Sequence, residues 1–126
     1  MSDGAVSPDP SPPDPSAIDW SHVADLRDEI GADEFAEVLE LFLADSDEMV
    51  EALAGQPPSA YEEALHALKG AALNMGLSGL AEICRQGERL AAEGRADEVQ
   101  IVQVLTGYAA ARAALVSGLH GGKGAG

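Results

Sequence analysis

Aromatic and basic residues are the scarcest classes in this chain of 126 residues. One Trp, two Tyr and two Phe leave little material for β-strands, which usually draw on aromatic and β-branched residues. The chain has seven Lys and Arg but twenty-two Asp and Glu, so its formal net charge is -15. A nucleic-acid backbone or an anionic membrane needs a basic patch on its partner, and we therefore expect neither as a partner here.

Cysteine is almost absent. Cys84 stands alone and cannot form an internal disulfide, which favours the reducing cytoplasm as the location. We find no secretory signal peptide and no long apolar run, so no membrane span is expected. The length suits a single compact domain.

Helix-breaking residues gather at the two ends. Residues 1–17 hold five of the seven prolines, together with Ser and Asp, and this composition predicts a disordered tail. The glycine-rich residues 118–126 predict a second flexible tail. The folded domain should then span residues 18–117.

Within this domain the apolar residues recur at three- and four-residue steps, which is typical of amphipathic helices. We expect helices over residues 20–30, 33–54, 59–77, 80–92 and 97–117, separated by Gly and Pro. Short loops favour antiparallel neighbours, so the expected fold is all-α, an up-down antiparallel four-helix bundle with one additional short N-terminal helix. The expected buried face of the third helix is Tyr61, Leu65, Leu68, Ala72 and Met75, and that of the fifth is Val99, Val102, Leu105, Ala109, Ala113 and Val116.

One histidine stands out on the third helix. At about 100° per residue, His66 lies roughly 140° from the apolar stripe and should face solvent. Gly70 shares this outer face one turn later, although glycine costs about 1 kcal/mol in a helix interior. Lys69 and Leu73 flank the same face. A solvated histidine, a glycine that permits helix packing and a Leu73 that covers a groove are the alternative interpretations.

The segment from His66 to Gly76 resembles the signature of the histidine phosphotransfer (Hpt) domain family of two-component phosphorelays, H-x-L-K-G with a second glycine ten residues after the histidine. The resemblance implies that His66 is the phosphoacceptor. It implies that Lys69 is an electrostatic partner of the phosphoryl group, and that Gly70 gives clearance to an incoming protein. Ala71 stands where many family members have Ser.

The same resemblance places Glu88, twenty-two residues after His66, where family members carry a Gln or Glu that hydrogen-bonds the histidine ring. The alternative for Glu88 is a solvated acid that contacts neighbours such as Arg85. The docking face implied for the partner consists of Ala67, Gly70 and Leu73, with outward residues of the second helix.

The function implied is a phosphocarrier without kinase activity of its own. We expect a monomer, since phosphotransfer needs only one histidine per encounter and no second apolar stripe is obvious in the sequence. Its partners would be receiver domains of response regulators or of a hybrid histidine kinase. No cofactor is expected on this chain, since the receiver brings its own Mg²⁺. A phosphate-independent adaptor that binds receivers is the alternative, and the phosphotransfer module of a chemotaxis-type kinase has a similar fold. An enzyme is disfavoured, because His22, His66 and His120 lack metal-ligand spacing and Cys84 falls on an apolar face.

Overall fold

The structure, a computed structural model, describes residues 14–120. These residues form the helices α1 (Trp20–Ile30), α2 (Ala32–Ala54), α3 (Tyr61–Met75), α4 (Ser78–Ala92) and α5 (Ile101–His120). Short 3-10 turns, η2 (Pro58–Ala60) and η3 (Ala96–Glu98), precede α3 and α5. No strand occurs in the described part of the chain, and the predicted all-α fold is confirmed.

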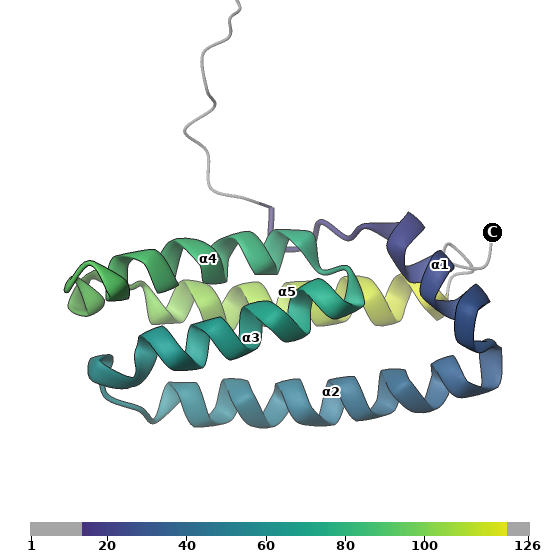
Figure 1. Cartoon of the computed structure of the whole chain (residues 1–126), viewed down its shortest axis with the longest axis horizontal. Coiled ribbons are helices and arrows are strands. Elements are labelled where there is room, and N and C mark those ends of the chain that lie inside the picture. Colours follow the sequence, from purple (N-terminus) through teal and green to yellow (C-terminus); the bar gives the residue numbers. More distant parts are fainter. Residues whose placement is uncertain (1–13, 121–126) are drawn as a thin grey trace, which may run out of the picture.

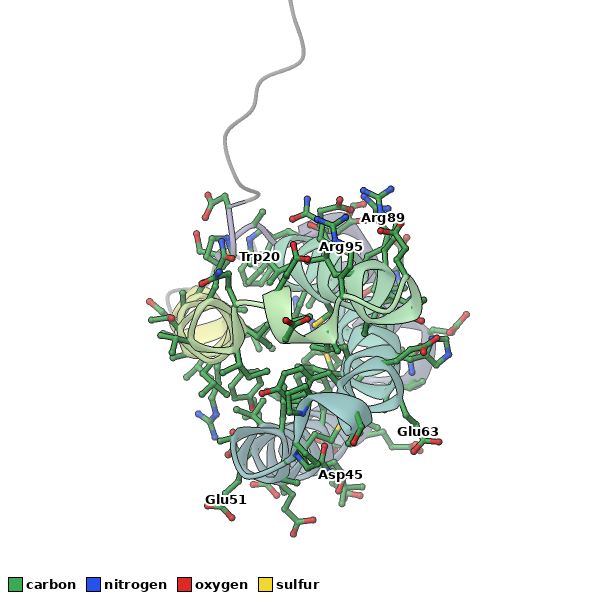
Figure 2. All side chains as sticks on the ribbon, turned by 90° about the vertical axis from the view of Figure 1, so that its left-hand side faces the viewer. Trp20, Asp45, Glu51, Glu63, Arg89 and Arg95 are labelled. Carbon is green, nitrogen blue, oxygen red and sulfur yellow. The ribbon has the colours of Figure 1, made fainter. Side chains whose placement is uncertain are left out.

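Helices α2 to α5 run up and down as an antiparallel bundle (Figure 1). Helix α3 packs between α2 and α4, while α5 packs on α2 and α4 from the other side. Helix α1 lies across one end of the bundle and contacts α2. In this arrangement α3 and α5 occupy opposite sides of the bundle, as the end-on view in Figure 2 shows.

Local chemistry explains where the helices at this end begin and end. The Asp19 carboxylate caps α1 by accepting from the His22 amide at 3.2 Å. Gly76 ends α3 with φ at 81°, the left-handed conformation that glycine adopts without a steric penalty. The Gly76 carbonyl then accepts from the Asp19 amide at 2.8 Å, which ties the start of α1 to the end of α3.

The core is aliphatic, and it includes the predicted stripe of α3: Leu65, Leu68, Ala72 and Met75 are buried, while Tyr61 is partly buried. Cys84 is buried as expected, and burial raises the pKa of its thiol to about 12, so the thiol is inert at neutral pH.

The predicted buried face of α5 is wrong apart from Val99, which precedes the helix. Val104, Tyr108, Ala111 and Leu115 are the buried side chains of α5. The other predicted residues are partly or fully exposed: Val102, Leu105, Ala109, Ala113 and Val116. Helix α5 carries apolar side chains on nearly all of its sides. Their spacing is therefore compatible with more than one buried face.

Helix α5 also contains a segment, residues 101–119, that is long and apolar enough to cross a membrane by length and composition. The expectation that the chain has no long apolar run therefore needs correction. Only 28% of this segment is buried in the fold. A bundle helix of a soluble protein passes the same test, so the segment is weak evidence for a membrane span.

The packed region extends beyond the predicted limits of 18 and 117. The Ala17 carbonyl accepts from the Gly79 amide at 3.1 Å, and Pro15 lies against Gly107. Gly118 belongs to α5 and contacts the Trp20 ring. The predictions of disorder for residues 1–13 and of flexibility for residues 121–126 lie outside the described residues.

Candidate functional site

The His66 side chain projects from α3 into solvent, with 68% of its surface exposed. The cause is the one-sided apolar stripe of α3, which turns the opposite face outward. The ring is held at one nitrogen only: its Nδ1 lies 2.8 Å from Glu88 Oε2 on the neighbouring helix α4. The Nε2 atom is therefore the one left to meet a reaction partner.

Glu88 bridges two side chains of α3. Its second oxygen, Oε1, lies 2.7 Å from Lys69 Nζ. Lys69 and Glu88 are both largely covered by their neighbours, in contrast to His66. Arg85 binds Glu82 instead, so the interpretation of Glu88 as a solvated partner of Arg85 is wrong.

Glu88 remains ionised because Lys69, and secondarily His66, hold the pKa of its carboxyl below the usual value. An ionised carboxylate can only accept hydrogen bonds, so the hydrogen on Nδ1 of His66 must point at Glu88. This hydrogen bond selects the tautomer in which Nε2 carries a free lone pair.

The outer face of α3 beside His66 is smooth. A Cβ placed on Gly70 would meet nothing within 4 Å, so this glycine does not serve helix packing. Ala67 is exposed, and Leu73 leaves 54% of its surface in solvent. Gly70 and Ala67 therefore leave the approach to the ring open, and Leu73 adds an exposed apolar side chain on the same face.

A groove of about 540 Å³ opens next to this face, between α1, α2 and α3. Ala71 and Asn74 border it on α3, and Leu41 on α2 is 65% exposed. The His22 ring donates from Nε2 to the Asn74 carbonyl at 2.9 Å and holds α1 at the rim. The remaining lining is mostly apolar, with one carboxylate: Leu26, Val38, Phe42, Asp45, Met49 and Met75.

Metal ligands do not converge here. Among the described residues, no group of three His, Cys, Asp or Glu side chains could hold a metal ion. His66 has one acidic neighbour rather than a ligand set.

The sequence model of the Hpt domain family matches residues 37–115, which is 79 of the 126 residues. The chain belongs to the Hpt domain family. The comparisons with curated proteins and with solved structures gave no match. Hpt domains are phosphocarriers of two-component systems, not kinases, and they interact with receiver domains and histidine kinases.

Sequence reasoning about this Hpt domain missed the groove. Outward residues of the second helix were expected in the docking face, but Leu41, Asp45 and His22 were not predicted individually as site residues. The signal was weak, because the groove depends on how α1 crosses the bundle. The exposure of the apolar Leu41 depends on how α2 packs beside α3, which the sequence does not reveal.

Proposed function

We propose that this chain accepts a phosphoryl group on Nε2 of His66 from a receiver aspartate and passes it to another response regulator in a phosphorelay. One observation carries the proposal. The exposed ring has its Nδ1 bound to an ionised Glu88 and its Nε2 unobstructed. A nucleophile fixed by a neighbouring base and open on its reactive side is what in-line phosphoryl transfer needs.

The proposed step conserves atoms and charge. The Nε2 lone pair forms the N–P bond while the P–O bond to the receiver aspartate breaks, and the carboxylate leaves. The hydrogen on Nδ1 stays in place, so the ring becomes a phosphoimidazolium with a positive charge. Glu88, 2.8 Å from Nδ1, stabilises that charge as it develops. The receiver supplies the Mg²⁺ that neutralises the phosphoryl oxygens.

Lys69 acts first as a positioning residue in this proposal. Its ammonium holds Glu88 Oε1 at 2.7 Å, which keeps the carboxylate turned toward the ring. The same ammonium lies one turn from the phosphoryl position and can attract the phosphoryl oxygens after transfer.

The proposed docking surface joins the face around His66 to the groove beside it. Gly70 and Ala67 permit close approach, and Leu73 and Leu41 offer exposed apolar area on either side. A receiver that covers both helices would bury a patch of ordinary size for a transient signalling contact.

The first experiment is incubation of the chain with phosphorylated receiver domains, followed by detection of acid-labile, base-stable label on the wild type and on His66→Gln. Label on the wild type alone is expected. Incubation with ATP and Mg²⁺ but without a kinase should leave both proteins unlabelled. Label on His66→Gln would refute His66 as the acceptor, and receiver binding without any label would identify an adaptor.

A further inference from the structure

The outward face of α5 is apolar and has no partner within the described residues. Val102 is 71% exposed, the highest value for any large apolar side chain described. Ala109 and Ala113 are exposed, and Leu105 and Val116 are partly exposed. All five lie on the side of α5 away from Val104, Ala111 and Leu115, which face the core. The helix thus has two apolar faces, of which the bundle uses one.

This face is also the one uncharged stretch among the five helices. Helices α1 to α4 each carry at least two acidic residues, whereas α5 has none. The single charged residue within positions 101–119 is Arg112, and its guanidinium binds the Asp47 carboxylate on α2 through two contacts of 3.0 Å. Arg112 and Asp47 keep 39% and 45% of their side-chain surfaces exposed, so this neutral ion pair borders the outer face of α5, while the face itself carries no charged side chain.

Helix α5 lies on the opposite side of the bundle from α3 (Figure 2). His66, Gly70 and the groove belong to the α3 side. A partner on α5 would therefore leave the phosphotransfer face open, and the inference below does not depend on the role of His66.

We propose that the outer face of α5 binds the same face of a second copy of this chain, forming a weak antiparallel dimer. Two copies with a net charge of -15 repel each other, and α5, as the helix without acidic residues, is where that repulsion is smallest. Symmetry fits as well, since a two-fold axis pairs one patch with itself.

The spacing of the residues supports this pairing. Val102 and Val116 each lie seven residues from Ala109. An antiparallel pair with its two-fold axis at Ala109 therefore sets Val102 against the partner subunit's Val116. The small side chains of Ala109 and Ala113 at the centre let the two helices approach closely.

The contact is weak. One helix face buries less than the roughly 800 Å² per partner of a standard interface, and the net charges of the two copies repel each other. Added salt screens that repulsion without weakening apolar contact, so the dimer strengthens as ionic strength rises. A dimer held by ion pairs would show the opposite trend.

The test is sedimentation equilibrium of the full chain at several protein concentrations in about 0.1 M and about 1 M NaCl. We expect a monomer–dimer equilibrium whose dissociation constant falls at least severalfold in the higher salt. Ala109→Glu, which puts one charge from each copy at the two-fold axis, should leave a monomer in both salts. Leu41→Glu on α2 is the matched control, because it replaces another exposed apolar residue and should not change the dimer.

Helical circular dichroism and phosphoryl acceptance check that Ala109→Glu is folded, and Val102→Lys is the second variant if it is not. A monomer at every concentration and salt, or a dimer unaffected by both α5 variants, overturns the proposal. Flotation with phosphatidylcholine vesicles tests whether the outer face of α5 binds a membrane instead of a second copy. Vesicle binding lost in Ala109→Glu, without a dimer in the wild type, would assign the face to a membrane instead.

Discussion

At the residue scale, a single carboxylate fixes the ring of His66. Glu88 reaches from α4 to two side chains of α3, His66 and Lys69, and each contact uses a different oxygen. The ring orientation therefore depends on the register between the two helices. The structure also explains why a glutamate suits this position, since the hydrogen bond with Lys69 lowers the pKa of the carboxyl and keeps it an acceptor.

Glu88→Ala should slow phosphoryl transfer to His66 without abolishing it. A hydrogen bond to a charged group is worth about 1.5–3 kcal/mol, which corresponds to a rate roughly ten- to a hundredfold lower. The ¹⁵N shifts of the His66 ring should move from the Nδ1–H tautomer toward a mixture of the two. Glu82→Ala on the same helix is the control, because its partner is Arg85. If Glu88→Ala leaves the rate of phosphoryl transfer and the ¹⁵N shifts of the His66 ring unchanged, Glu88 does not position the ring.

Gly70→Ala should raise the stability of the fold while it hinders the docking of a receiver. The added methyl meets nothing within 4 Å and relieves the helix of a glycine, so the free energy of unfolding should rise by about 0.5–1 kcal/mol. The same methyl stands on the face that a receiver must approach, so transfer should slow. Gly87→Ala is the contrast, since its Cβ would lie 2.8 Å from Leu65 Cδ1 and should cost about 1–3 kcal/mol. Denaturant unfolding measures the stability of the two variants, and transfer kinetics measure the effect on docking. A Gly70→Ala variant with undiminished transfer contradicts the clearance role.

Leu73→Asp should weaken receiver binding. Full burial of a leucine is worth about 1.5–3 kcal/mol, and even half of that shifts the dissociation constant several-fold. Val102→Asp is the matched control, because Val102 is also an exposed apolar residue but lies on the far helix α5. Titration of a labelled receiver measures both. Equal affinity for wild type and Leu73→Asp would place the docking patch elsewhere.

At the scale of elements, the sequence predicts a helix well where its apolar residues occupy one side. Helix α3 has such a stripe, and its buried face and the outward direction of His66 follow from spacing alone. Helix α5 is apolar nearly all round, so spacing fits two faces. The choice between them rests on Tyr108, whose hydroxyl lies 2.8 Å from Ser46 Oγ and also donates to Asp47. Those partners lie about sixty residues away in the chain, and no local pattern reveals them.

The site was only partly predictable for the same reason. His66, Lys69 and Gly70 belong to one helix and could be placed on one face from their spacing. Glu88 entered through the family resemblance, since its approach to His66 depends on how α4 packs beside α3. The groove needs three helices at once and lay beyond sequence reasoning.

The contact between α2 and α5 should make stability depend on pH. Hydrogen bonds from Arg112, and then from Tyr108, hold the pKa of Asp47 below its ordinary value of 3.8. The folded state thus binds this proton less readily than the unfolded state does. The stabilisation is fully present above about pH 4, and it is lost as the pH falls through the lowered pKa.

Asp47→Asn should accordingly be less stable than the wild type at pH 7, with a difference that shrinks as the pH falls below 3.8. Thermal unfolding over this range measures it. Glu51→Gln is the control on the same helix, where the side chain points away from the bundle (Figure 2). A constant gap between wild type and Asp47→Asn at all pH values would contradict the linkage.

At the scale of the whole molecule, charge is distributed unevenly along the chain. Residues 1–65 contain seventeen of the twenty-two acids and one base, Arg27. Helix α2 belongs to this part, and its Asp45 lines the groove beside the His66 face. Helix α5, which packs beside α2 and lies opposite α3, presents an outer face without acids. A partner of the groove is therefore expected to bring positive charge, whereas a partner of α5 is expected to be apolar.

The two faces should then respond to salt in opposite directions. Raising NaCl from about 0.1 M to about 1 M shortens the Debye length from about 10 Å to about 3 Å. Attraction between the acidic α2 side and a basic receiver surface weakens under this screening, so receiver affinity should fall, chiefly through slower association. Self-association through α5 should strengthen over the same range, because only repulsion is screened there. Stopped-flow receiver binding and sedimentation on the same samples measure both, and Asp45→Asn should flatten the first trend alone. If the two affinities change in the same direction, the assignment of an acidic docking face and an uncharged dimer face is wrong.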